Sequence, residues 1–282
     1  MSSPINAQVD EDTGLRYYTF NDQRLVSATS IRKAVGMPLG LHNWVVNQHI
    51  DAVLDDAPLL TIALDKEGAE LMRRIKRRNG STESDAEARL RARRAARAVI
   101  RKEADSERDT AAALGTAVHE AAEYGIKADS LSDEDERKPF MLQYERWLEE
   151  QKPVVLWTEG QLFSLTHGYA GSFDLIADVD GRRTLIDIKT GRDIYTDHAL
   201  QLALYFGADF VGGYDPHEEQ DVIYEEATRF FQSCVDMAVL HLRPDKYELV
   251  RIPLTDELSA AALDMVHFAH WLLAHPTIDT LL

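Results

Sequence analysis

Cysteine is almost absent from this sequence, since Cys234 is the only one among 282 residues. A single thiol excludes an internal disulfide and any iron–sulfur cluster held by four cysteines of the chain. Long apolar runs are also missing, because no stretch approaches the roughly 18 residues that cross a bilayer. Nothing before Ser30 resembles the basic and then apolar segments of a signal peptide. We therefore expect a cytoplasmic location and no membrane partner.

Positive charge is scarce overall, with 31 Lys/Arg against 48 Asp/Glu and a formal net charge of −17. Such a balance argues against a nucleic-acid partner. Residues 73–102 reverse it, because they hold 12 Lys/Arg and three acidic residues, a local charge of +9 that leaves −26 on the rest. An acidic body with one basic arm can still hold a phosphate backbone, so nucleic acid stays open as a partner.

Apolar periodicity divides the chain into a mostly helical first part and a mixed second part. In residues 1–108 it predicts two short strands within 15–29 and helices at 31–35, at 41–54, in the second half of 60–78 and at 84–102. In residues 109–282 it predicts helices at 110–127, around 140–148, at 196–210 and after Thr255, and strands at 154–165, 169–179, 183–189, 237–242 and 247–252. This order favours an α/β fold with a central mixed β-sheet flanked by helices, in one compact unit.

Asp180-Gly181 lies between two of the predicted strands and is a strong signal for a two-residue hairpin turn. In such a hairpin Asp174 and Asp187 lie equally far from the turn, so they face each other on one side of the sheet with Cβ atoms about 4.5–5.5 Å apart. Lys189, two residues after Asp187, points the same way. The other side would carry an apolar set that suits a core: Phe173, Leu175, Ala177, Ile186 and Ile188.

Two facing carboxylates repel each other unless a cation neutralises them. A hard divalent cation such as Mg²⁺ or Mn²⁺ would do so through oxygen ligands. The alternative is an ordinary hairpin with two solvated aspartates, and the hairpin alone does not decide between these two interpretations.

A helical stripe, a strand carboxylate and a pair of residues one helical turn apart bear on that choice. In chain order they are Gly115/His119/Glu123, Glu159 and Gln201/Tyr205. A lone helical histidine is more often structural, a strand carboxylate is more often exposed, and a helical Gln/Tyr pair is most often plain surface. Their order along the chain, more than any one of them, favours a functional site.

The segments that carry these residues resemble the RecB-like branch of the PD-(D/E)XK nucleases, with the nearest likeness to phage-encoded exonucleases. They are GTAVHEAAE, WTEGQLFSLTHGYAGSFDLIADVDG and TLIDIKTGRDIYTDHALQLALY, and the opening RLVSATSIRKAVG…LHNW is similar to the start of those phage proteins. The resemblance covers nearly the whole chain. It implies a restriction-endonuclease-like sheet for residues 109–282, and the cytoplasm of a bacterial host if the chain is phage-encoded.

The resemblance also implies a role for each matching residue. Asp174, Asp187 and the backbone carbonyl of Ile188 match metal-binding positions, and His119 matches a helix histidine that binds a metal. Lys189 matches the catalytic lysine. A last set matches positions that assist the metal or lie beside the scissile strand: Glu159, Gln201 and Tyr205. Members of this branch with an iron–sulfur cluster need four cysteines, so the chain resembles the cluster-free group.

The segment from Ser84 to Lys102 is predicted to be a basic helix. Four arginines recur at every fourth position and form one stripe that would contact a nucleic-acid backbone: Arg89, Arg93, Arg97 and Arg101. The alternative is a solvated helix that pairs with the acidic remainder of the chain.

We expect a Mg²⁺- or Mn²⁺-dependent DNA exonuclease of recombination, repair or phage DNA metabolism, acting on DNA ends or single strands. A recombination or single-strand annealing protein would be a further partner. An endonuclease of the same chemistry and a non-catalytic DNA-end-binding protein stay open. A small-molecule metalloenzyme is disfavoured by the basic arm and the lysine on the strand.

Overall fold

The computed structural model describes residues 7–10, 15–35 and 109–275. By its internal contacts the chain divides into a unit of residues 1–38 and 114–282 and a second unit of residues 39–113. The strands before residue 36 therefore share a unit with the second half of the chain. The predicted helices at 41–54, within 60–78 and at 84–102 lie outside the described residues.

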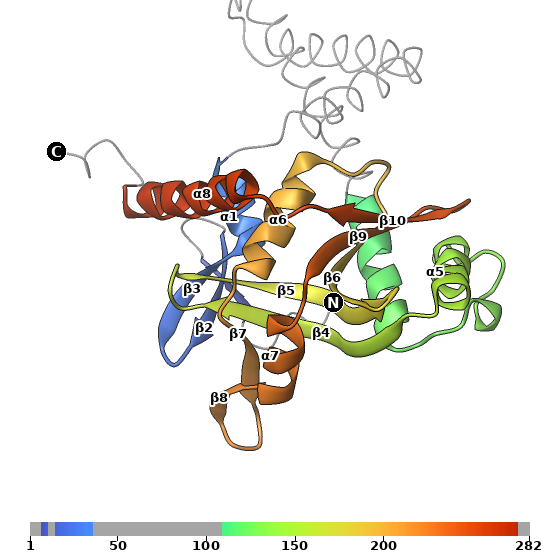
Figure 1. The fold of residues 1–282 in the computed structure, drawn as a ribbon, viewed down its shortest axis with the longest axis horizontal. Helices are drawn as coiled ribbons and strands as arrows, with labels where there is room; N and C mark the ends of the chain where they lie inside the picture. The colour runs from blue at the N-terminus through green and yellow to red at the C-terminus, as the bar shows by residue number, and fades with distance from the viewer. Residues whose placement is uncertain (1–6, 11–14, 36–108, 276–282) are drawn as a thin grey trace, which may run out of the picture. The chain divides into compact units, whose positions relative to one another are not determined.

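A mixed sheet of ten strands forms the centre of the described part (Figure 1). The strands are β1 (Ala7–Val9), β2 (Arg16–Phe20), β3 (Gln23–Ser27), β4 (Val154–Ser164), β5 (Tyr169–Val179), β6 (Arg182–Lys189), β7 (Phe210–Asp215), β8 (Gln220–Ile223), β9 (Asp236–Leu242) and β10 (Tyr247–Ile252). One path runs β1-β2-β3-β5-β4-β7-β8, and β6, β9 and β10 continue from β5. Two neighbouring pairs, β3 with β5 and β6 with β9, are parallel. The predicted α/β class with a mixed central sheet is confirmed.

Helices cover both faces of this sheet, and each face has its own apolar core. α1 (Ala28–Val35), α6 (Thr196–Phe206), α7 (Glu225–Gln232) and α8 (Asp256–Ala274) pack in one cluster, which we call the α6 cluster. The helix over residues 109–123, the short η1 (Ala128–Ser130) and α5 (Lys138–Gln151) pack in another, the α5 cluster. Leu185 and Ile186, neighbours on β6, belong to different clusters, so the clusters lie on opposite faces.

The Asp180-Gly181 turn forms as the sequence predicts. Both residues have positive φ, 53° and 73°, as a two-residue turn that matches the strand twist requires. The register that follows from it, from Val179↔Arg182 to Leu175↔Ile186, is the predicted one. Asn21 and Asp22 form a second such turn between β2 and β3, with φ of 46° and 63°.

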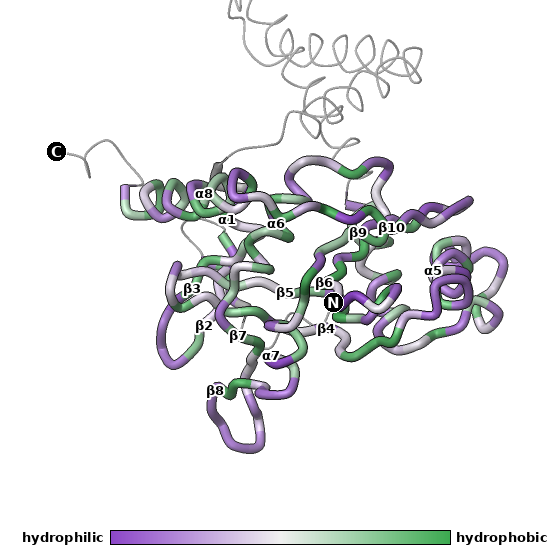
Figure 2. Tube along the Cα trace, in the orientation of Figure 1, coloured by the Kyte–Doolittle hydropathy of each residue, from purple (hydrophilic) through white to green (hydrophobic). Residues whose placement is uncertain are grey.

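The structure differs from the sequence prediction after residue 206. α6 ends at Phe206, four residues earlier than predicted, and β7 begins at Phe210 and pairs with β4. Residues 211–236, for which the sequence predicted neither helix nor strand, hold β8 and α7. The apolar residues within 206–211 are compatible with the end of a helix or with a strand, and pairing with β4 makes residues from Phe210 onward a strand. Figure 2 shows that the tip of the β7–β8 hairpin is hydrophilic.

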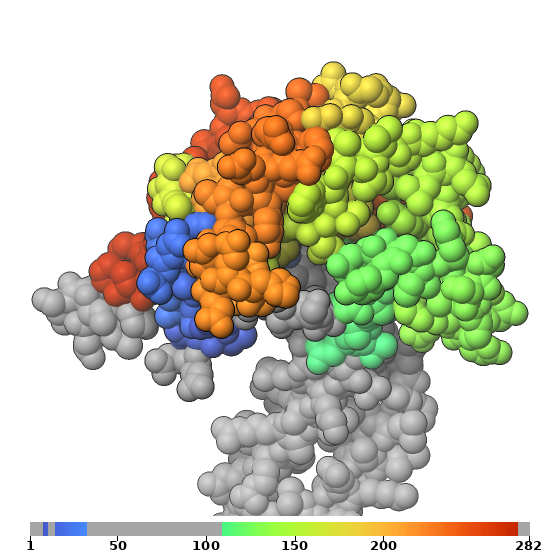
Figure 3. Space-filling view, turned by 90° about the horizontal axis from the view of Figure 1, so that it is seen from below, coloured from blue at the N-terminus to red at the C-terminus, as the bar shows by residue number. Residues whose placement is uncertain are grey.

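The N-terminal hairpin packs beside the β7–β8 segment, as the blue and orange surfaces in Figure 3 show. The ring centroids of Phe20 and Phe210 are 4.9 Å apart, and the Asn21 N–H donates to Asp221 Oδ2 at 2.7 Å. Because β3 also pairs with β5, α1 at its end lies against α6 and α8. A residue of α1 can therefore reach α6.

Candidate functional site

Along the edge that faces β3 and β6, strand β5 has a stretch that pairs with neither strand, which we call the opening. The first residues of β5, Tyr169 and Ala170, pair with β3, and its residues from Leu175 onward pair with β6. The four residues between them, 171–174, pair with neither of these two strands. The Ile188 N–H on β6 donates instead to the Asp174 side chain, at Oδ2. The carboxylate of Asp174 thus replaces a ladder hydrogen bond at the point where the strands separate.

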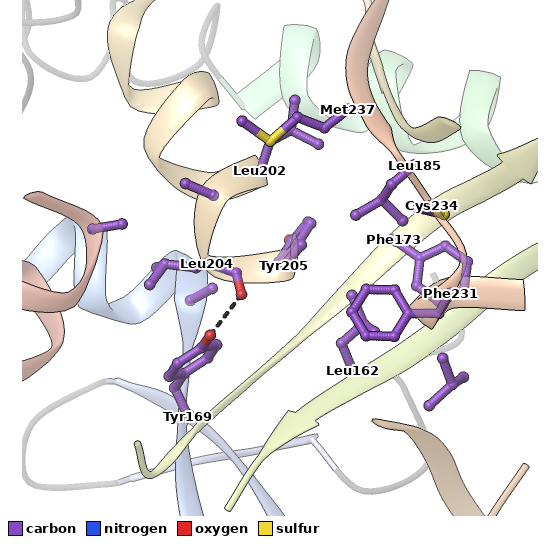
Figure 4. Packing of buried hydrophobic residues seen from close by; sticks show 14 of the residues in the cluster. Leu162, Tyr169, Phe173, Leu185, Leu202, Leu204, Tyr205, Phe231, Cys234 and Met237 are labelled. Atoms are coloured by element: carbon purple, nitrogen blue, oxygen red, sulfur yellow. Dashed lines mark hydrogen bonds between the residues drawn. The ribbon is translucent and has the colours of Figure 1, made fainter. Parts of the chain in front are cut away.

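At the same point the regular alternation of side chains along β5 is interrupted. Phe173 packs in the α6 cluster, whereas Leu175 packs in the α5 cluster. Figure 4 shows Phe173 on the same side of the sheet as Leu185 and Tyr205. A regular alternation predicts Phe173 beside Leu175, and this prediction is wrong.

The neighbouring strand explains the change of face. Glu159 of β4 lies opposite Asp174 in the register set by Thr158↔Leu175 and Gly160↔Phe173. Its φ of 48° lies in the left-handed region, which costs a residue with a side chain about 1–3 kcal/mol. A Cβ at Gly160 would lie 2.4 Å from the Phe173 ring, so only a glycine at this position leaves room for that ring. Both strands therefore kink together at Glu159 and Asp174.

Three carboxylates consequently occupy one row across three neighbouring strands. Glu159 on β4 faces Asp174 on β5, and Asp174 and Asp187 each adjoin Leu175↔Ile186, the last pair of β5 with β6. His119 Nδ1 lies 3.0 Å from Asp174 Oδ1. One ligand atom each from His119, Glu159 and Asp174 fall within 4.8 Å of one another, a spacing that suits a bound metal ion. The structure therefore brings Glu159, which the resemblance implies as a residue that assists the metal, directly into the group of His119 and Asp174.

His119 is held by the packing of its helix. Val118, Ala121 and Ala122 are buried in the α5 cluster, so the face that carries His119 turns toward Asp174 in the middle of β5. Gly115 lies one turn earlier, where a Cβ would approach Thr190 Oγ1 to 3.0 Å. The glycine thus allows the helix to lie close to the residue that follows Lys189. This accounts for the Gly115/His119 spacing in the sequence.

Burial and charge shift the pKa of each acid in the row. Burial and the Asp174 carboxylate raise the pKa of Glu159 to about 8. Burial also raises the pKa of Asp187, against the opposing effect of the Lys189 ammonium. For Asp174 burial is outweighed by His119 and Lys189, so its pKa is lowered. Asp174, whose two cationic neighbours lower its pKa, is thus the acid of the three that ionises most readily.

His119 responds to the same charges in the opposite sense. Burial alone would lower its pKa, but the facing Asp174 carboxylate outweighs burial and raises it. A metal ion bound here would have to displace that proton, because only a neutral imidazole nitrogen binds a metal. With His119 neutral, Lys189 and a divalent cation would together balance the charges of three ionised carboxylates.

Lys189 and Asp187 form an ion pair beside this group rather than within it. Lys189 Nζ also lies 3.4 Å from the carbonyl oxygen of Ile188, the atom implied as a metal ligand by the resemblance. On β9, His241 lies opposite Lys189, and its Nε2 donates to Gly191 O at 2.7 Å. His241 thereby fixes the start of the loop after Lys189, a role that nothing in the sequence indicated.

Gln201 and Tyr205 lie on the other face of the opening, and both are buried. The ring of Tyr205 covers Gly171, where a Cβ would lie 2.3 Å from Tyr205 Cε1. Arg32 of α1 donates from Nη1 to Gln201 Oε1 at 2.6 Å, and its Nη2 lies 2.8 Å from Asp197 Oδ2. Sequence reasoning missed Arg32 and Asp197, because no spacing links α1 to α6.

The predicted site residues thus fall into three sets. His119, Asp174 and Glu159 come together, and Asp187, Ile188 and Lys189 adjoin them on β6. Gln201 and Tyr205 approach from α6. The predicted nucleic-acid stripe lies outside the described residues: Arg89, Arg93, Arg97 and Arg101.

No protein-family model and no curated protein matches this sequence. A solved structure, described as the crystal structure of SSO0001, is similar at 14% identity over 76% of this chain and 86% of its own, with a TM-score of 0.30. A likeness at this level carries no functional argument. Among residues 7–10, 15–35 and 109–275, no helix is both long and apolar enough to span a membrane.

Proposed function

We propose that this chain is a Mg²⁺- or Mn²⁺-dependent nuclease of the PD-(D/E)XK type that acts on DNA as an exonuclease. The observation that carries the proposal is the row Glu159–Asp174–Asp187 across three strands, with His119 on one side and Lys189 beside it. A restriction-endonuclease-like core is part of the same proposal, supported by the mixed sheet with helices on both faces.

The donor set fits a divalent cation. Two carboxylates and one imidazole offer atoms within 4.8 Å of one another, and oxygen-rich sets of this kind suit Mg²⁺ and Mn²⁺. Burial and the neighbouring Asp174 carboxylate raise the pKa of Glu159, and a cation bound beside the two carboxylates would offset their repulsion. A divalent ion bound there would supply an acidified water and polarise a phosphoryl oxygen.

The chain's own residues would do the remaining work. Lys189 is held by Asp187 at the edge of the row, where its ammonium can orient an attacking water or stabilise charge on the phosphate. The Asp187 side chain is 4% exposed and that of Lys189 22%, so this ion pair is largely shielded from water. Asp174, with His119 and the Ile188 N–H as partners, holds a fixed orientation.

Digestion of end-labelled linear DNA and covalently closed circular DNA, each with Mg²⁺ or Mn²⁺, tests this proposal. Loss of the linear substrate alone is expected for an exonuclease. Cutting of both forms would make the chain an endonuclease with the same site. Binding of DNA ends without cutting, at every metal tried, would support a non-catalytic DNA-end-binding protein.

A further inference from the structure

The Arg32–Gln201–Tyr205 chain of hydrogen bonds has a direction that chemistry alone sets. A guanidinium has only donors, so the Gln201 atom that faces Arg32 Nη1 at 2.6 Å has to be the amide oxygen. The Gln201 NH₂ group then faces Tyr205 and donates to its hydroxyl oxygen. The Tyr205 hydroxyl accepts from Gln201 and therefore keeps its own proton free to donate elsewhere.

Arg32 is fixed firmly enough to impose this direction. Its second nitrogen pairs with Asp197 Oδ2 at 2.8 Å, and its side chain is 20% exposed while that of Asp197 is 8% exposed. Gln201 is 6% exposed, so water does not compete for its amide. Breaking either contact would leave a buried polar group unpaired, which is costly.

Tyr205 lies against the part of β5 that leads to the candidate site, so its free proton can be donated there. Tyr205 covers Gly171 on the unpaired edge of β5, three residues before Asp174. The carboxylates of Asp187 and Asp174 are close enough to add to the effect of burial in raising the pKa of Tyr205 well above its usual value. Tyr205 is 3% exposed, so its neutral hydroxyl is a donor to a phosphate oxygen or an ordered water bound at the acidic row and not to bulk water.

We infer that Arg32 is a positioning residue that fixes the direction of the Gln201–Tyr205 hydrogen bond, so that the Tyr205 hydroxyl donates its proton into the active site. Without Arg32 the amide can turn, and Tyr205 can then donate to Gln201 Oε1 instead. The catalytic consequence rests on the proposed nuclease function, whereas the direction of the hydrogen bond does not.

Four variants test the inference through kcat and KM on linear DNA. Tyr205→Phe removes the donor and Arg32→Met removes what directs it, so each should lower kcat about 10- to 100-fold with little change in KM. The double variant should be no worse than either single variant. Arg32→Lys should restore most of kcat, because an ammonium also only donates. Arg24→Met, which removes an exposed arginine of β3, is the matched control and should keep kcat.

Gln201→Glu separates this inference from a merely structural role. A glutamate keeps the size and gives Arg32 a carboxylate partner, but it offers Tyr205 only acceptors, so the hydroxyl proton turns toward residue 201. We expect a loss of kcat as large as in Tyr205→Phe, with unchanged thermal stability. Full kcat in this variant, or multiplied losses in the Arg32→Met/Tyr205→Phe double variant, would overturn the inference. If Arg32→Met does not fold, Gln201→Glu and Arg32→Lys still decide.

The side-chain amide signals of Gln201 in NMR provide a readout independent of cleavage. They should be protected from exchange and shifted in the wild type, in Arg32→Lys and in Arg24→Met, and should lose both properties in Arg32→Met. Unchanged signals in Arg32→Met would refute the positioning role. A wild type that cuts no DNA but shows the expected signals would remove the proposed nuclease function and leave the hydrogen-bond direction standing.

Discussion

Glu159→Gln should have opposite effects on stability in the absence and presence of a divalent cation. Without a cation, Glu159 faces Asp174 in a kinked, partly buried position, and its pKa is raised to about 8. Glutamine has the same shape and no charge, so it relieves the repulsion. With a cation bound, glutamine is a poorer ligand, and the wild type gains more stability from the metal.

The sign of the pH dependence follows from the raised pKa. A group that binds its proton more tightly in the folded state contributes stability below its unfolded pKa and loses that contribution as the pH rises through the folded pKa. For Glu159 this window runs from 4.5 to about 8. The upper limit of the loss is about 4 kcal/mol near pH 8, and solvent at this partly exposed side chain reduces it. A difference of about 1 kcal/mol would already shift the melting temperature by about 2–4 °C.

The assay is thermal unfolding of wild type and Glu159→Gln at about pH 5 and about pH 8, each with chelator and with Mn²⁺. In chelator the variant should match the wild type at the lower pH and exceed it at the higher pH. In Mn²⁺ at the higher pH the order should reverse. Glu149→Gln, an exposed change on α5, should shift neither comparison. A Glu159→Gln variant less stable than the wild type in chelator at the higher pH would refute a destabilising charge at Glu159.

Two further changes test the active site and the predicted nucleic-acid contact. Asp187→Ala and Lys189→Ala should each lower cleavage of linear DNA by about a hundredfold or more while gel-shift binding is retained, because both groups act on the reacting phosphate; near-normal turnover in either variant would exclude it from the site. In Arg89/Arg93/Arg97→Gln each lost phosphate contact should lower the slope of log affinity against log salt by about 0.7 on single strands or 0.9 on duplex. An unchanged slope would leave those arginines without a role in DNA binding.

Local sequence predicted the part of the site that depends on local geometry. Asp180-Gly181 sets the turn, the turn sets the register, and the register brings Asp174 and Asp187 next to the last pair of the two strands, Leu175↔Ile186. Helical spacing likewise places Gly115 and His119 on one face of their helix. These relations hold because each depends on the period of a single element or on one turn.

The rest depends on contacts between distant segments. No local rule places Glu159 in a left-handed conformation, since glutamate is not a residue that favours it. That conformation accompanies the packing of the Phe173 ring against Gly160, a contact between two strands. In the same way, Arg32 meets Gln201 only because β3 pairs with β5 and carries α1 to α6. The separation of β5 from β6 could not be predicted for the same reason. A sequence pattern indicates where strands lie but not where two neighbouring strands separate.

Asp174 shows why fold and function are difficult to separate at this site. Its Oδ2 accepts the Ile188 N–H that the parted strands leave without a backbone partner, while Oδ1 faces His119. An Asp174→Ala variant would therefore leave a buried N–H unsatisfied, at a cost of about 1–3 kcal/mol, in addition to removing a candidate metal ligand. Activity lost in that variant would not distinguish a catalytic role from a structural one. Asp187 and Lys189 pair chiefly with each other, so their variants report on the chemistry more directly.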